Sequence, residues 1–120
     1  MKTQPVIEHI VQWLSDYLER SRLMGFVVGV SGGIDSAVTS TLCARTGAAV
    51  KVLNMPIHQA PDQFDRASRH IGWLEGRYSN VEGITVDLTP VFAAMQATFP
   101  KEIQDGLSMA NSRSRLRMLT

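Results

Sequence analysis

The chain has 120 residues, of which 44% are hydrophobic and 19% are charged. This length and composition predict a single domain over residues 1–120 and exclude a multidomain enzyme. Twelve Lys and Arg residues against eleven Asp and Glu residues leave a net charge of +1. Such a balance gives no electrostatic reason to expect a nucleic-acid partner.

The apolar runs of the chain are short. The stretch 26–28, for example, falls far below the roughly 18 apolar residues that span a bilayer, so no membrane partner is expected. The first twenty residues carry Glu8, Asp16 and Glu19, do not resemble a secretion signal, and predict a cytoplasmic location. The only cysteine, Cys43, is expected to be a small buried residue, because it has no partner for an internal disulfide.

The first half of the chain alternates helical and strand patterns. Apolar residues spaced three and four apart predict an amphipathic helix over 5–20. The apolar, β-branched run 26–30 is typical of a buried parallel strand. A loop of Ser and Gly at 31–33 then leads into a helix predicted over 34–45, which Gly47 is expected to end.

The next segment repeats the alternation. Residues 49–55 predict a second strand that Pro56 ends, and residues 61–76 predict a third helix. The apolar residues of this helix are spaced for one buried face and are Phe64, Ala67, Ile71 and Leu74.

The last third of the chain predicts one more strand and two more helices. The strand is expected over 84–88, with Thr89 as the N-cap of a helix to about residue 98 and a further helix around 107–119. This order predicts an α/β fold, a doubly wound parallel sheet with helices on both faces and right-handed crossovers. Only three strands are present, so the sheet is expected to be truncated.

The loop after the first predicted strand carries the sharpest functional signal. It reads Gly29, Val30, Ser31, Gly32, Gly33, Ile34, Asp35 and Ser36. In an open α/β sheet, ligands bind beyond the carboxyl ends of the strands, where glycines and a helix N-terminus form an anion cradle. Asp35 would repel a bare phosphate unless a cation lies between them, so this carboxylate predicts Mg²⁺.

Two motifs point to one family. The loop lacks the Lys-Ser/Thr pair of a Walker A motif and closely resembles the SGGxDS pyrophosphate loop of the ATP-pyrophosphatase superfamily. The stretch 111–118 resembles the N-x-x-A-R-x-R-M motif of NAD synthetases, from which it departs at Ser114. Another departure is Ala110, where glycine is frequent. The whole chain therefore resembles the amino-terminal half of an ammonia-dependent NAD synthetase.

This resemblance implies an activity and a set of binding residues. ATP would adenylate the carboxylate of deamido-NAD, pyrophosphate would leave, and ammonia would displace AMP to give NAD⁺. Residues 29–36 would bind ATP, Asp35 would bind Mg²⁺, and Arg115 would contact deamido-NAD. No protein nucleophile is expected.

The resemblance also implies an assembly. Members of the family form homodimers, and their sheet continues with a strand beside the first one. We therefore expect a homodimer, an exposed edge on the first strand, an incomplete domain, and little or no activity of this chain alone.

Two other functions stay open. The chain could be a different adenylating enzyme of the superfamily, such as a tRNA thiolase, although its low charge and single cysteine argue against this. It could also be a non-catalytic module that only binds ATP.

Weaker candidates flank these motifs. Arg113 and Arg117 are expected to share a solvated basic helix face opposite Arg115. His9 and His70 are expected at the surface. Residues that follow predicted strands, and that could contact a nucleotide or simply line a solvated loop or cap, are Asn54, Met55, His58, Gln59 and Asp87.

Overall fold

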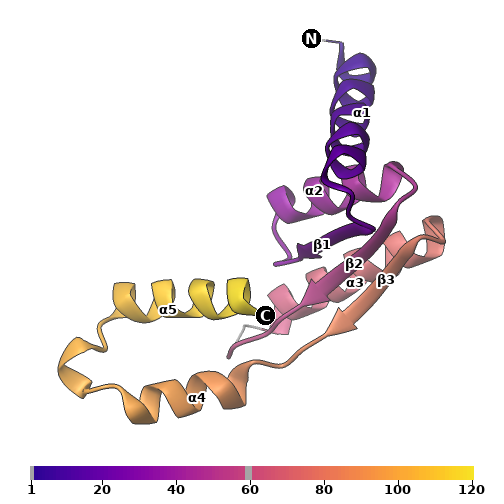
Figure 1. The fold of residues 1–120 in the computed structure, drawn as a ribbon. Coiled ribbons are helices and arrows are strands. Elements are labelled where there is room, and N and C mark those ends of the chain that lie inside the picture. The colour runs from indigo at the N-terminus through magenta and orange to yellow at the C-terminus, as the bar shows by residue number, and fades with distance from the viewer. Residues whose placement is uncertain (1, 59–60) are drawn as a thin grey trace.

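The computed structural model describes residues 2–58 and 61–120 (Figure 1). In chain order its elements are α1 (Thr3–Ser21), β1 (Gly25–Gly29), α2 (Ile34–Arg45), β2 (Ala49–Asn54), α3 (Pro61–Arg77), β3 (Val81–Thr85), α4 (Thr89–Thr98), the short 3₁₀ helix η1 (Lys101–Ile103) and α5 (Gly106–Leu119). The predicted α/β alternation is confirmed. Within the described ranges, no helix combines the length and apolar character needed to cross a membrane.

The three strands form a parallel sheet in the order β1-β2-β3. The register places Val28 beside Val52 and Val52 beside Gly83. Side chains of the central strand β2 alternate between buried and exposed or half-buried positions, because successive residues point to opposite faces of the sheet, and Val50 and Val52 are 1% and 0% exposed.

Helices α2 and α3 cover one face of this sheet and form the main core with it. The predicted inner face of α3 is confirmed, since Ala67, Ile71 and Leu74 are buried and Phe64 is half-buried. Cys43 of α2 is also buried, as expected, and burial raises the pKa of its thiol. The opposite face is more open, and Lys51 and Glu82 form an exposed ion pair there.

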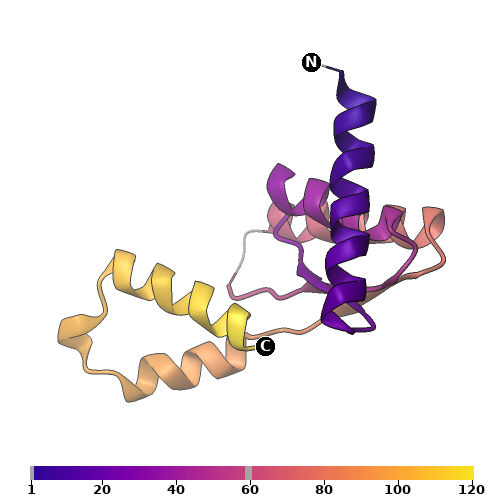
Figure 2. The same cartoon turned by 45° about the horizontal axis from the view of Figure 1, so that its top comes forward.

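A second, smaller core joins α4 and α5 beyond the carboxyl ends of the strands. It contains Ile57, Leu88, Phe92 and Met109, all buried. Figures 1 and 2 show these two helices side by side at that end of the sheet, with the chain terminus returning toward β1. In the same views α1 projects away from the sheet, and none of its residues is buried.

The third strand lies three residues earlier than predicted, at 81–85 rather than 84–88. Glu82 and Gly83 have low strand propensity, yet Val81 is buried in the main core and Gly83 lies against α3. A Cβ at position 83 would lie 2.3 Å from the Cγ2 atom of Ile71, so glycine allows this close packing. Leu88 belongs to the second core instead of the strand.

The start of α4 also differs from the prediction. Leu88 is the N-cap residue, and Thr89 is the first residue of the helix. The Oδ1 atom of Asp87 accepts a hydrogen bond from the N–H of Thr89 at 2.9 Å. Asp87 is therefore the capping side chain. Hydrogen bonds from the backbone and the side chain of Thr89 lower the pKa of its carboxyl group.

Candidate phosphate-binding site

The glycine-rich loop lies at the carboxyl end of β1, where the sequence predicts it. Gly29 ends β1 and Ile34 begins α2, so residues 30–33 connect the two elements. The N–H of Val30 donates to the carbonyl of Leu53 at 2.8 Å, which holds the start of the loop against β2. The loop thus begins from a fixed point in the sheet.

Gly32 has a backbone conformation that favours glycine. Its φ is +88°, in the left-handed region, and a Cβ atom would lie 2.7 Å from the carbonyl oxygen of Gln63. The loop therefore packs directly against the first turn of α3. A larger residue at position 32 would push the loop away from that helix.

Two serines close the loop on itself. The Oγ atom of Ser36 accepts a hydrogen bond from the N–H of Ser31 at 3.0 Å, and the two hydroxyl oxygens lie 3.2 Å apart. The Oγ atom of Ser31 in turn accepts from the N–H of Gly33 at 3.3 Å. These bonds preorganise residues 31–36 before any ligand is bound.

The N-terminus of α2 remains available to an anion. Gly33 occupies the N-cap position and supplies no capping side chain. Within the described part of the chain, no side chain accepts a hydrogen bond from the N–H groups of residues 34–36. Free N–H groups and the positive end of the helix dipole favour a phosphate at this position.

Asp35 lies in the first turn of α2 and is exposed. No cluster of three or more potential metal ligands occurs among residues 2–58 and 61–120. Mg²⁺ fits a lone carboxylate, because it commonly binds one or two protein carboxylates and completes its shell with phosphate oxygens and water. The donor set around Asp35 is therefore compatible with Mg²⁺ bound together with a polyphosphate.

A cavity of about 530 Å³ lies between the loop and the carboxyl-terminal end of α5. Its lining combines β1 and loop residues with β2 and α5 residues. These are Val27, Gly29, Val30, Ser31, Leu53, Met55, Ser114, Arg117, Met118 and Thr120. Part of the predicted carboxyl-terminal motif thus lies beside the predicted phosphate loop, although more than 75 residues separate them in the chain.

Two of the three arginines of that motif, Arg113 and Arg117, do not lie where the sequence predicts them. The Nε of Arg117 donates to the carbonyl oxygen of Met55 at 3.0 Å, and the guanidinium of Arg113 lies 5.7 Å from the ring centre of Phe92. Both side chains are half-buried. The prediction of a solvated basic face is therefore wrong, because this face of α5 packs on α4 and the end of β2. Arg115 is exposed on another side of the helix.

The weaker candidates after β2 have structural contacts. Asn54 is 1% exposed, and its Nδ2 donates to the Oγ atom of Ser68 at 3.2 Å. His58 is exposed, has a φ of +49°, and its N–H donates to the Oγ1 atom of Thr89 at 3.2 Å. Gln59 lies outside the described residues.

A hydrogen-bonded pair, His70 and Ser40, lies behind the loop and was not predicted from the sequence. The Nε2 atom of His70 lies 2.9 Å from the Oγ atom of Ser40, and that hydroxyl donates to the carbonyl of Ser36 at 2.7 Å. His70 is thus half-buried between α2 and α3, and its predicted surface position is wrong. Burial lowers the pKa of its imidazole, and a hydrogen bond to the carbonyl of Ala37 partly offsets this effect. Helical periodicity gave no signal for a pair that joins two helices.

A parallel α/β sheet whose first strand runs into a preorganised, glycine-rich loop at a helix N-terminus is the arrangement typical of nucleotide-binding α/β proteins. Residues 6–120 match the family described as NAD synthase. The chain belongs to this family.

Similarity to individual relatives extends over the whole chain. The NH(3)-dependent NAD(+) synthetase of Finegoldia magna is 32% identical over 121 residues, which cover 100% of this chain and 48% of that protein. The enzyme of the same name from Methanosarcina mazei is 35% identical over 115 residues, or 91% of this chain and 43% of that protein. The chain therefore spans about half the length of these relatives.

Solved structures show the same fold. An NMN synthetase from Francisella tularensis superimposes with a TM-score of 0.86 at 31% identity, over 99% of this chain and 48% of that one. An NH3-dependent NAD synthetase from Campylobacter jejuni gives a TM-score of 0.84 at 27% identity, over 98% of this chain and 49% of that one. The fold of this chain thus superimposes on about half of each of these structures.

Proposed function

We propose that this chain supplies the ATP-binding part of an enzyme that amidates deamido-NAD with ammonia to form NAD⁺. The observation that carries the proposal is the preorganised loop 29–36, with its free helix N-terminus, in a member of the NAD synthase family. The similarity to proteins named NH(3)-dependent NAD(+) synthetase supports ammonia as the nitrogen donor.

The proposed reaction has two steps. A carboxylate oxygen of the nicotinate ring attacks the α-phosphorus of ATP, and the bond to the β-phosphate bridging oxygen breaks, which releases pyrophosphate. Ammonia then attacks the acyl carbon, AMP leaves with the bonding electrons, and the surplus proton passes to solvent. Neither step requires a covalent bond to the protein.

The loop would act by electrostatic stabilisation. The free backbone N–H groups of residues 34–36 and the hydroxyl of Ser36 would bind the β- and γ-phosphates as the leaving pyrophosphate gains negative charge. Asp35 would hold Mg²⁺, which when bound neutralises part of the phosphate charge. The hydrogen bonds between Ser31 and Ser36 fix the loop, so that little reorganisation is needed during the reaction.

Arg115 remains our proposed contact to the dinucleotide. Its exposed position on α5 fits a substrate that approaches from outside this chain. A homodimer with substrate across the interface would provide that arrangement. We propose this assembly together with a cytoplasmic location.

A mononucleotide substrate is a second candidate. The Francisella structure with a TM-score of 0.86 is described as an NMN synthetase, which supports the amide of nicotinate mononucleotide as the alternative product. Assays with ammonia, Mg·ATP and either deamido-NAD or nicotinate mononucleotide would separate the two substrates. We expect little or no turnover by this chain alone, and rapid product formation would contradict that expectation.

Isothermal titration of the chain with Mg·ATP tests the phosphate site. We expect Asp35→Ala to weaken binding by roughly tenfold or more, because charge-assisted contacts contribute about 1.5–3 kcal/mol. Asp62→Ala is the matched control, since Asp62 lies in the first turn of the neighbouring helix α3. Equal effects of both substitutions, or binding that does not depend on Mg²⁺, would contradict the proposed role of Asp35.

A further inference from the structure

Arg117 lies at the boundary between α5 and the cavity beside the loop. Ser114, Arg117 and Met118, spaced three and four apart on one helix face, line the same cavity as Gly29 and Ser31. The Nε of Arg117 donates to the carbonyl oxygen of Met55, just after β2. This bond fixes the side chain and occupies one of the N–H donors of the guanidinium.

The remaining donors of Arg117 have no acceptor among the described residues. The ion pairs found in the described ranges are Lys51 with Glu82 and Arg66 with Asp62, so neither supplies a carboxylate to Arg117. Burial, and to a lesser extent the charge of Arg113, lower the pKa of the Arg117 guanidinium. A half-buried cation without a counter-ion is energetically unfavourable, and an anion in the cavity would remove that penalty.

The cavity also limits what the anion can be. Its lining is largely apolar apart from Arg117, the hydroxyls of Ser31, Ser114 and Thr120, and the backbone of the loop. Gly29, Val30 and Ser31, at the start of the loop, therefore lie on one side of the cavity, and the guanidinium of Arg117 lies on the other. A polyphosphate carries enough anionic oxygens to contact both the loop and the guanidinium.

We infer that Arg117 is a binding residue for the polyphosphate chain of the nucleotide held by loop 29–36. This inference rests on the proposed function and deepens it, because it assigns a role to a motif arginine other than Arg115. Since the Met55 carbonyl holds Arg117 from β2, a bound polyphosphate would connect the loop, the end of β2 and α5.

Titrations of the chain with Mg·ATP, magnesium pyrophosphate and adenosine test this inference. We expect Arg117→Met to weaken Mg·ATP and pyrophosphate by roughly tenfold or more and to leave adenosine unchanged. Its pyrophosphate affinity should also depend less on salt, because one cation is lost. Arg45→Met is the control and should bind pyrophosphate within about twofold of the unsubstituted chain, because Arg45 is an exposed arginine in the last turn of α2, outside the cavity lining.

The possible outcomes separate this inference from the proposed function. Pyrophosphate affinity of Arg117→Met within about twofold of the unsubstituted chain would overturn the inference. If thermal unfolding shows that this variant is destabilised, Arg117→Gln decides instead. It removes the charge but keeps a polar side chain, and an unchanged pyrophosphate affinity would overturn the inference.

The unsubstituted chain provides the second distinction. A chain that binds pyrophosphate but not Mg·ATP would contradict the proposed function, while the role of Arg117 would still be measured with pyrophosphate. A chain that binds neither probe would overturn both.

Discussion

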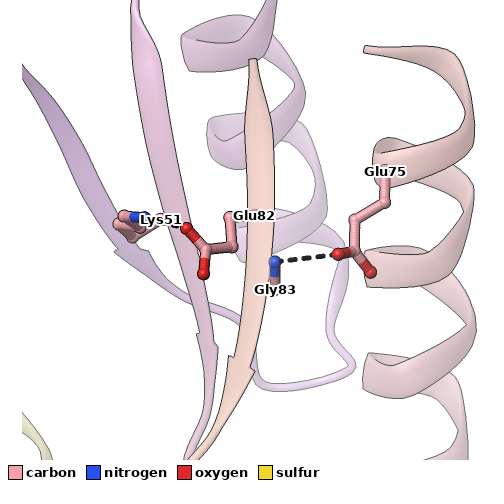
Figure 3. Close-up of polar contacts among 4 residues, drawn as sticks. All are labelled: Lys51, Glu75, Glu82 and Gly83. Atoms are coloured by element: carbon pink, nitrogen blue, oxygen red, sulfur yellow. Dashed lines mark hydrogen bonds and ion pairs between the residues drawn. The ribbon is translucent and has the colours of Figure 1, made fainter. Parts of the chain in front are cut away.

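At the β3 edge of the sheet, the Oε2 atom of Glu75 from α3 accepts a hydrogen bond from the N–H of Gly83 at 3.1 Å (Figure 3). On the other side of the same strand, Glu82 pairs with Lys51 of β2. Along the free edge of β1, by contrast, no described side chain forms a hydrogen bond with the backbone of residues 25–29.

The two edge strands of the sheet thus differ in how their backbone groups are protected. Unpaired strand edges are templates for further pairing, and natural proteins usually cover or charge them. Here Glu75 of α3 occupies one N–H group of the β3 edge, whereas the β1 edge, which leads into the phosphate loop, offers free pairing groups to another strand. This confirms the exposed first-strand edge that the resemblance implied.

The largest expected difference in stability is between substitution of a buried apolar side chain of α3 and of an exposed one of β1. Leu74 of α3 is 0% exposed, so Leu74→Ala should lower the free energy of unfolding by about 2–5 kcal/mol. Val27→Ala on β1 should change it by less than about 0.5 kcal/mol, because Val27 already contacts solvent. Urea denaturation measures both values, and a comparable loss for Val27→Ala would show that the open face of β1 is covered in solution.

Removal of the edge hydrogen bond should have a smaller effect. Glu75→Ala leaves the N–H of Gly83 without its side-chain acceptor and should cost about 0.5–1.5 kcal/mol. Self-association should also increase, since the β3 edge would then resemble that of β1. Denaturation and sedimentation velocity measure the two effects. Glu82→Ala is the control, which removes only an exposed ion pair, and an equal rise in its self-association would argue against edge protection by Glu75.

The smallest expected effect concerns the contact between His70 of α3 and Ser40 of α2, the helix that follows the loop. The pKa of His70 is lowered in the folded chain, chiefly by burial, whereas in the unfolded chain it should be near the ordinary value of about 6.5. The unfolded state therefore binds the proton more tightly, so this contribution to stability is present above about pH 6.5 and is lost as the pH falls through the lowered pKa.

Urea midpoints between about pH 5 and pH 7.5 measure this dependence, in a range where carboxyl groups with ordinary pKa values stay ionised. His70→Gln should flatten the profile in this range. His9→Gln, in the projecting helix α1, is the control and should leave it unchanged. An unaltered profile for His70→Gln would mean that the burial of His70 does not contribute to this pH dependence.

Much of the fold was predictable because its signals are local. The run of apolar, β-branched residues before the loop, the buried face of α3 and the helix end at Gly47, whose φ is +81°, all follow from short-range periodicity and backbone preference. The third strand was misplaced because Gly83 is favoured there by packing against Ile71 rather than by strand propensity.

The candidate site also combines features that the sequence predicts with contacts that it does not. The sequence by itself determined the loop from Gly29 to Ser36 and its position after a strand, because glycine freedom, hydroxyl donors and a helix start are encoded in consecutive residues. Only the tertiary structure decided that Arg117 lines the loop cavity and that His70 lies behind the loop. The physical reason is that such contacts join residues distant in the chain, and the packing of helices against the sheet determines which side chains meet.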